Sequence, residues 1–314
     1  MLRFALTRLV STVLTLLASS FLIFGALALA PGSPLAALSG NRPLTPEQVA
    51  ALEERYHLND PFFVRYVQWV SDFVRGDWGI SIVQNDTVAN LIGARIGTTV
   101  TLVLYATILL LIIGLTVGML AAVSGPRVQA GVTAATTIAL ATPPFFYALV
   151  FVSIFAVGLG WFPVFGAGEG VLDRIWHLTL PAFALALSGC ALISRIVRNS
   201  VTEELGKEYA DVARARGFRE SRVLGRHVLR NALVPTVTIA GLTVAALFAD
   251  TAVIETAFGI NGIGQLLASS VLAKDFAVVQ AITLLIVFVF LATNLIVDLL
   301  YRVLDPRMSK AVVA

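Results

Sequence analysis

The sequence predicts an all-α integral membrane protein with six transmembrane helices. Of its 314 residues, 58% are hydrophobic and only 13% are charged, and the mean hydropathy is +0.88. Soluble domains carry about 25% charged residues, so the composition excludes a soluble enzyme, a disordered chain and a collagen-like fibre. Uncharged stretches recur along the chain, each long enough for the about 20 residues that cross a bilayer. The expected spans are 9–30, 99–123, 131–157, 177–197, 234–254 and 277–301.

Residues 1–30 are expected to form the N-terminus and the first span. The uncharged segment Leu9–Ala30 is longer than the about 7–15 residues of a signal-peptide core. The sequence ALA at Ala28–Ala30 resembles a cleavage site, but Pro31 follows the point of cleavage and disfavours processing. We therefore expect this helix to be retained.

Residues 31–97 are too polar for a simple connector and predict an extra helical segment on the extracytoplasmic side. Thr45, followed by Pro46 and Glu47, is typical of a capped helix start. A second helix is expected after Asp60-Pro61 and ends at Gly76–Gly79 (GDWG). Its apolar residues near helical spacing are Phe63, Val67, Val70 and Val74.

Residues 98–314 are expected to form a five-helix transmembrane core. One uncharged window, Val128–Gly168, has room for two spans. Its second part, Gly158–Gly168, carries four glycines and a proline and reads as a turn at the membrane interface. We therefore expect a single helix over 131–157.

The loop of about 198–233 combines an apolar pattern with many basic residues. Gly217 is expected to end a first helix, and a second, basic helical stretch covers Ser221–Asn231. The loop either lies on anionic lipid as an amphipathic segment or docks a cytoplasmic partner. The residues expected on one face of the first helix are Leu205, Tyr209, Val212, Ala213 and Arg216.

The distribution of basic residues sets the expected orientation. Most of the 22 lysines and arginines fall on one side of the six spans, together with both termini. Because basic loops stay in the cytoplasm, the N- and C-termini are expected to be cytoplasmic. The pI of about 9.2 is then a signal of topology and does not indicate nucleic-acid binding.

The segment 255–275 is rich in glycine and joins the last two spans. Non-helical backbone at membrane depth survives only in protein or beside a cavity, so the segment is either a partly re-entrant gate or an ordinary external loop. Asp250, near the end of the fifth span, is either an interfacial residue or an anion facing the transport pathway. The tentative gate and pathway residues are Asp250, Glu255, Phe258, Gly259, Gly262 and Gly264.

Two motifs in the basic loop carry a resemblance to a known family. Glu208–Gly217 (EYADVARARG), followed by Arg226–Pro235 (RHVLRNALVP), resembles the coupling loop of ABC importer permease subunits. The chain is similar to the peptide/nickel branch, and specifically to the first membrane subunit of dipeptide and oligopeptide importers. Further motifs in the family's order are Ala28–Pro34, Tyr56–Pro61, Arg75–Ser81, Gly160–Pro163, Glu255–Gly264, Asn294–Tyr301 and Asp305–Arg307.

This resemblance implies a type I importer permease fold in a bacterial cell membrane and a set of partners. These are a second homologous permease, two ATPase subunits or domains, an extracytoplasmic substrate-binding protein and membrane lipid. The sequence has no G-x-x-x-x-G-K-[ST] motif, so ATP and Mg are expected on the partner ATPases, with no catalytic residue or cofactor in this chain. The residues that the resemblance assigns to ATPase coupling are Leu205, Glu208, Tyr209, Ala210, Val212, Ala213, Arg216 and Gly217.

The same resemblance leaves the cargo open. Peptides are expected, with nickel chelates, haem or glutathione as alternatives within the branch. An ion-driven secondary transporter is a weaker alternative, because Asp250 and Asp298 are the only carboxylate residues within the expected spans and no internal repeat is visible. A Cys/His metal site is not expected, because Cys190 is the single cysteine and the three histidines stand far apart.

Overall fold

The computed structural model describes residues 2–29, 45 and 60–304, and helices are the regular elements in these ranges. The chain divides into two compact units. Unit 1 takes Met1–Thr99 and Asn261–Leu291, and unit 2 takes Val100–Ile260 and Ala292–Ala314. The expected helix after Thr45 and the tail after Leu304 lie outside the described residues.

Unit 1 is built from apolar helices around two small clusters. Its elements are α1 (Leu2–Ala28), α4 (Phe62–Val74), the start of α5 (Val88–Val123), α12 (Ile263–Leu272) and the first part of α13 (Phe276–Leu304). Aromatic side chains join α1 to α4, and a buried aliphatic cluster joins α5, α12 and α13. The second helix expected within residues 31–97 is confirmed as α4, and Gly76, with φ of 90°, follows its end.

A buried carboxylate ties two loops of unit 1 together. Ser81 Oγ donates a hydrogen bond to Asp275 Oδ2 at 2.5 Å, and the Val83 amide donates to the same oxygen. Both Ser81 and Asp275 are almost fully buried. The loop before α5 is therefore held against the turn between α12 and α13.

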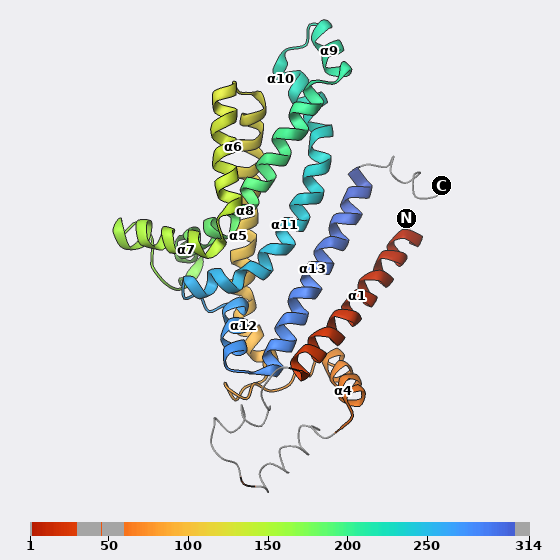
Figure 1. Ribbon diagram of the computed structural model, residues 1–314, viewed down its shortest axis with the longest axis vertical. Helices are drawn as coiled ribbons and strands as arrows, with labels where there is room; N and C mark the ends of the chain where they lie inside the picture. Colours follow the sequence, from red (N-terminus) through yellow and green to blue (C-terminus); the bar gives the residue numbers. More distant parts are fainter. Residues whose placement is uncertain (1, 30–44, 46–59, 305–314) are drawn as a thin grey trace. The chain divides into compact units, whose positions relative to one another are not determined.

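Unit 2 contains the main helical core. It comprises the rest of α5, α6 (Pro126–Ala141), α7 (Pro144–Phe151), η1 (Val152–Gly158), α8 (Gly170–Leu205), α9 (Glu208–Ala215), α10 (Glu220–Arg222), η2 (Val223–Val228), α11 (Leu229–Ala257) and the end of α13. In Figure 1, α6, α8 and α11 run side by side. Glycines let neighbouring helices approach closely, as small residues do in membrane bundles. A Cβ on Gly118 would lie 2.6 Å from the Ser194 carbonyl oxygen, and one on Gly241 would meet the Val297 side chain.

The membrane helices are longer than the apolar pattern predicts. Both α5 and α8 have 36 residues, which corresponds to about 54 Å of helix against a hydrocarbon core of about 30 Å. Hydropathy marks only the part of a helix that lies in lipid, so the predicted starts at residues 99 and 177 came too late. The helices continue into more polar sequence beyond their apolar windows.

The prediction of a single helix over 131–157 is wrong. The segment is a bent pair, in which α6 and the α7–η1 helix meet at 104°. Pro143 and Pro144 explain the break, because proline lacks an amide hydrogen and disfavours helical backbone in the residue before it. Thr142 and Pro143 accordingly have extended backbones, with ψ of 127° and 146°. The described residues thus hold five continuous candidate spans, or six if the bent pair is one.

Candidate functional site

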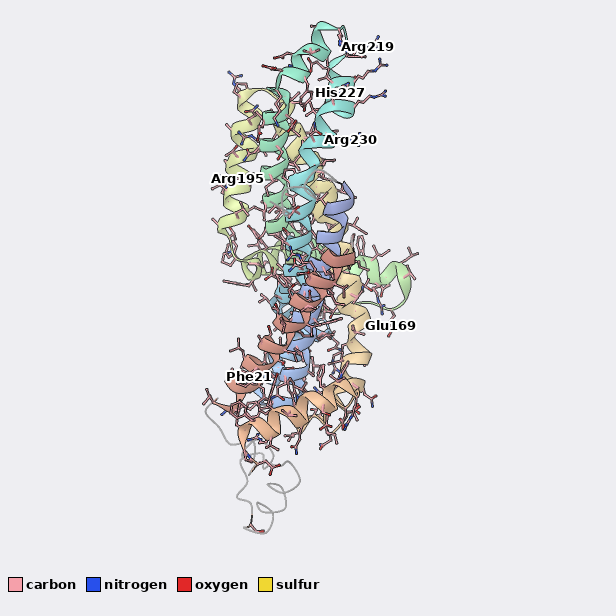
Figure 2. The ribbon with its side chains drawn as sticks, turned by 90° about the vertical axis from the view of Figure 1, so that its right-hand side faces the viewer. Phe21, Glu169, Arg195, Arg219, His227 and Arg230 are labelled. Atoms are coloured by element: carbon pink, nitrogen blue, oxygen red, sulfur yellow. The ribbon has the colours of Figure 1, made fainter. Side chains whose placement is uncertain are left out.

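The coupling segment, defined here as residues 206–222, connects α8 to η2 and contains α9 and α10. Figure 1 shows α9 and α10 at the end of unit 2 where α8 finishes. Arg219, His227 and Arg230 lie at this same end, whereas Arg195 lies nearer the middle of α8 (Figure 2). The basic residues identified in the sequence are therefore gathered at one end of the helical core.

The prediction of one continuous helical face from Leu205 to Arg216 is wrong at its first residue. Leu205 is the last residue of α8, and the chain turns at Gly206 before α9 begins. Lys207 has an extended backbone, with ψ of 148°, which interrupts the helical register. Leu205 and Tyr209 therefore belong to two different helices.

The small residues of α9 face the protein's own core. Ala210 is fully buried and Ala213 is 6% exposed, and both belong to the cluster that includes Val223 and Val228. Val212, in contrast, is 51% exposed. The resemblance assigns both alanines to ATPase coupling, but here they are buried and bring α9 close to η2, so they do not present a surface to a partner. The coupling residues that remain outward-facing are Glu208, Val212, Arg216 and Gly217.

Glu204 holds the start of α9 against the end of α8. Its carboxylate accepts a hydrogen bond from Tyr209 Oη and another from Lys207 Nζ, each at 2.5 Å. Burial, followed by the hydrogen bond to Glu204, raises the pKa of Tyr209 above its ordinary value. The hydrogen bond to Glu204 likewise raises the pKa of Lys207, so both groups keep their protons at neutral pH. Sequence reasoning missed Glu204, because its contacts with Lys207 and Tyr209 depend on the turn of the chain at Gly206.

Arg214 forms a second polar tie within the coupling segment. Its guanidinium donates to Asp211 Oδ1 at 2.8 Å and to Glu220 Oε1 at 2.8 Å. These contacts to two carboxylates, Glu220 first, raise the pKa of Arg214 further. The arginine therefore joins α9 to α10, and its charge is balanced within the chain.

Gly217 ends α9 through a Schellman motif, which is a pair of backbone hydrogen bonds closed by a left-handed residue. The Gly217 amide donates to the Arg214 carbonyl at 2.9 Å, and the Phe218 amide donates to the Ala213 carbonyl at 3.2 Å. Gly217 has φ of 81°, which confirms its expected role as the residue that stops the helix. The basic stretch after it is helical as expected, but Val223–Val228 forms the π-helix η2. Wider turns of this kind often occur at functional sites.

The pathway residues of unit 2 gather at the C-terminal end of α11. Glu255 and Phe258 are buried, whereas Asp250 is partly buried. Gly259 has φ of 57° and closes a second Schellman motif, in which the Ile260 amide donates to the Glu255 carbonyl at 2.8 Å. The loop between η1 and α8 also reaches this end, because the Gly166 amide donates to the Phe258 carbonyl at 3.1 Å.

The other two expected gate residues belong to unit 1. Gly262 precedes α12 and Gly264 lies in its first turn, and both are buried. The glycine-rich segment is thus not uniformly irregular, because it contains the ten-residue apolar helix α12. Its role as a gate stays a prediction. Within the described part of the chain, no cluster of three or more His, Cys, Asp or Glu side chains could hold a metal ion.

Comparison with known families gives the context for this arrangement. The family described as "Binding-protein-dependent transport system inner membrane component" matches residues 114–310, and its N-terminal companion family matches residues 1–103. The chain belongs to this family. It is therefore a multi-pass component of the bacterial inner membrane, and the expected transport role is confirmed.

Relatives cover the permease along nearly its whole length. It is 37% identical to the oligopeptide transport system permease protein AppB of Bacillus subtilis, over 94% of this chain and 95% of AppB. It is 35% identical to the oligopeptide permease OppB of Salmonella typhimurium, over 98% and 99% of the two chains. The glutathione transport system permease GsiC of Salmonella choleraesuis is 34% identical, again over 98% and 99%.

A solved structure confirms the expected fold. An inward-facing structure of the MetNI methionine ABC transporter aligns with a TM-score of 0.59 at 20% identity. The alignment covers 68% of the permease and 96% of the other chain. The type I importer permease fold predicted from the sequence is thus confirmed.

Proposed function

We propose that the permease forms half of the translocation pathway of an ATP-driven peptide importer. Its partners are a second homologous permease, two ATPase subunits or domains that bind ATP and Mg, and an extracytoplasmic binding protein that delivers the cargo. The family description supports the binding-protein partner, and the names of AppB and OppB support peptide cargo. In this proposal the N- and C-termini lie in the cytoplasm, on the side of the coupling segment.

The coupling segment is the observation that carries this proposal. Its fold is fixed from within by the Glu204 hydrogen bonds, the Arg214 ties and the Gly217 turn. Its outer surface nevertheless exposes Val212, an apolar side chain that gains nothing from water. The coupling segment therefore forms a rigid protrusion, called the knob below. Its exposed apolar side chain suits a cleft in a partner ATPase better than it suits water.

The connections of this knob explain how its motion would reach the membrane. The segment lies between α8 and η2, and η2 runs directly into α11, so both neighbouring helices continue into the transmembrane core. When ATP closes the two ATPases, the two knobs of the permease pair move together. Because each knob is rigid, its displacement tilts α8 and α11 as bodies and switches the pathway from inward-facing to outward-facing.

Asp250 gives the pathway a candidate contact with peptide cargo. It lies on α11, two turns before the end of that helix, and is partly buried. A carboxylate in this position attracts the positively charged amino end of a peptide as it passes. Glutathione, itself a tripeptide with a free amino group, is the second candidate cargo, and the similarity to GsiC supports it.

Reconstitution of the whole importer tests the coupling role and the cargo separately. For coupling, Val212→Cys in a Cys190→Ala background should crosslink to an engineered cysteine in the ATPase cleft. Thr202→Cys is the matched control, because Thr202 is also exposed but lies on α8, outside the coupling segment. Equal crosslinking of both variants would refute the knob assignment.

For cargo, proteoliposomes holding the complete transporter should take up labelled di- and oligopeptides when the binding protein and ATP are present. Uptake of glutathione alone would replace peptides by the second candidate. Uptake that follows an ion gradient and ignores ATP would overturn the proposed importer altogether.

A further inference from the structure

The outer helix α4 has three distinct faces along its 13 residues. Every third or fourth residue repeats on the same side of a helix, so Phe62, Tyr66, Trp69 and Phe73 share one face. A second face carries Phe63, Val67, Val70 and Val74 at the same spacing, turned by about 100° from the first. The remaining face carries the polar residues Arg65, Gln68 and Asp72.

The first face packs against α1 through aromatic rings. Phe21 and Phe24 of α1 contact Phe62 and Tyr66 with ring centroids between 5.2 and 5.7 Å apart. The hydroxyl groups of Ser20 and Tyr66 are hydrogen-bonded at 2.8 Å. The side of α4 that faces α1 is therefore fixed.

The second face is apolar and largely uncovered. Phe63 is 69% exposed, Val67 is 63% exposed and Val74 is 80% exposed. Phe63 also stacks on Phe21 of α1, with ring centroids 6.3 Å apart. The exposed face of α4 is thus continuous with the exposed apolar surface of α1, on which Leu22 is 69% exposed.

The position of these contacts along α1 gives their depth in the membrane. The uncharged part of α1 begins at Leu9, directly after Arg8, and twenty residues from there end at Ala28. Phe24 and Phe21 precede Ala28 by about 6 and 10 Å of helix. Amphipathic helices that lie in the membrane interface bury their apolar face by about 5–10 Å. The contact of α4 with α1 falls in this same range.

We propose that α4 is an interfacial membrane anchor whose second face, Phe63, Val67, Val70 and Val74, is covered by lipid acyl chains. Tyr66 and Trp69 suit this depth, because both residue types are enriched at membrane interfaces. A soluble binding protein does not reach this depth, and lipid already covers the adjoining surface of α1. Under the proposed topology the leaflet is the outer one, but the covering by lipid does not depend on that assignment.

Site-specific quenching on the assembled transporter in nanodiscs tests the anchor. In the Cys190→Ala background, Phe63→Cys, Val67→Cys and Val74→Cys each carry a polarity-sensitive fluorophore. Matched labels on the polar face use Gln68→Cys and Asp72→Cys. Nitroxide-labelled lipids should extinguish the first set and leave the second set bright, whereas aqueous iodide should do the reverse.

Each alternative occupant gives a different result that overturns the anchor. Labels at all five positions that respond to iodide alone would place the second face in water. Protection of the first set only after binding protein is added would make that protein the occupant. Protection from both quenchers in the complete complex would assign the face to the partner permease.

A charge placed on the second face provides an independent check in case a label disturbs the helix. Val67→Glu should make a fluorophore at position 74 accessible to iodide, because a carboxylate is expelled from acyl chains. Gln68→Glu, one residue away on the polar face, should leave that label quenched by lipid. Identical responses to the two substitutions would refute the proposed anchor.

Discussion

The coupling segment and the C-terminal end of α11 end a helix in the same way but in different surroundings. Each ends a helix with a Schellman motif and a left-handed glycine, Gly217 in one case and Gly259 in the other. Around Gly217 the surroundings are open, and exposed ionic contacts hold the segment. Gly259 is exposed as well, but a Cβ added there would lie 3.2 Å from the ring of Phe165, and the preceding Glu255 and Phe258 are buried. The first turn is open on every side, whereas the second lies against the loop between η1 and α8.

The largest effect is expected where the coupling segment is itself buried. Ala213→Asp places an unpaired carboxylate in the buried cluster that includes Val223 and Val228, which costs several kcal/mol and should unfold α9. Val212→Asp puts the same charge on the exposed side and should leave α9 folded while weakening ATPase binding. Limited proteolysis of the purified complex separates the two, because only Ala213→Asp should expose new cleavage sites. Equal protease sensitivity would contradict the assignment of the buried face.

The two left-handed glycines should differ in their tolerance of a side chain. Left-handed backbone costs an ordinary residue about 1–2 kcal/mol, and this is the expected cost of Gly217→Ala. Gly259→Ala should destabilise the permease slightly more, because its Cβ would also lie 3.2 Å from the exposed Phe165 ring, which would have to shift. Thermal unfolding in detergent gives the ranking. A larger loss at Gly217 would break the contrast between the open turn and the turn that lies against Phe165.

A substitution at Asp250 tests whether the C-terminal part of α11 also serves transport. Asp250→Asn keeps the size of the side chain and removes its charge, so peptide uptake should fall, most for cationic peptides. ATPase coupling and membrane insertion should persist, because the coupling segment is unchanged. Uptake rates for cationic, neutral and anionic peptides provide the measurement. Unchanged rates for all three would make Asp250 an ordinary interfacial residue.

The smallest expected effect has the opposite sign. Lys274 lies in a third motif of the same kind, with φ of 57°, and the Asp275 amide donates to the Ser270 carbonyl at 2.9 Å. Lys274→Gly should relieve the strain and raise the free energy of unfolding by up to about 1 kcal/mol. Chemical denaturation of the two proteins side by side would show the gain. A clear loss of stability would mean that the lysine side chain contributes more than its backbone strain costs.

Composition and helical spacing were enough to predict the helical membrane fold, α4 and the stop at Gly217. These features depend on local chemistry, such as hydropathy and the backbone freedom of glycine. The bend at Pro143–Pro144 could have been predicted from the same local chemistry. It was not, because the helix was assigned from the absence of charged residues around the two prolines. The inward direction of Ala213 and the Glu204 hydrogen bonds could not be predicted. They depend on where the turn at Gly206 places α9 against η2, which is a tertiary relation with no local signature.

The close approach of α11 to the end of α13 has a consequence for the family's variation. A Cβ at position 241 would lie 2.0 Å from the Val297 Cγ2, so neither helix can accept bulk there without the other yielding. The two positions should therefore change together in related permeases. Where position 241 carries alanine or serine, position 297 should carry a smaller residue than valine. Such paired substitutions would indicate that the distance between α11 and α13 is the same in related permeases.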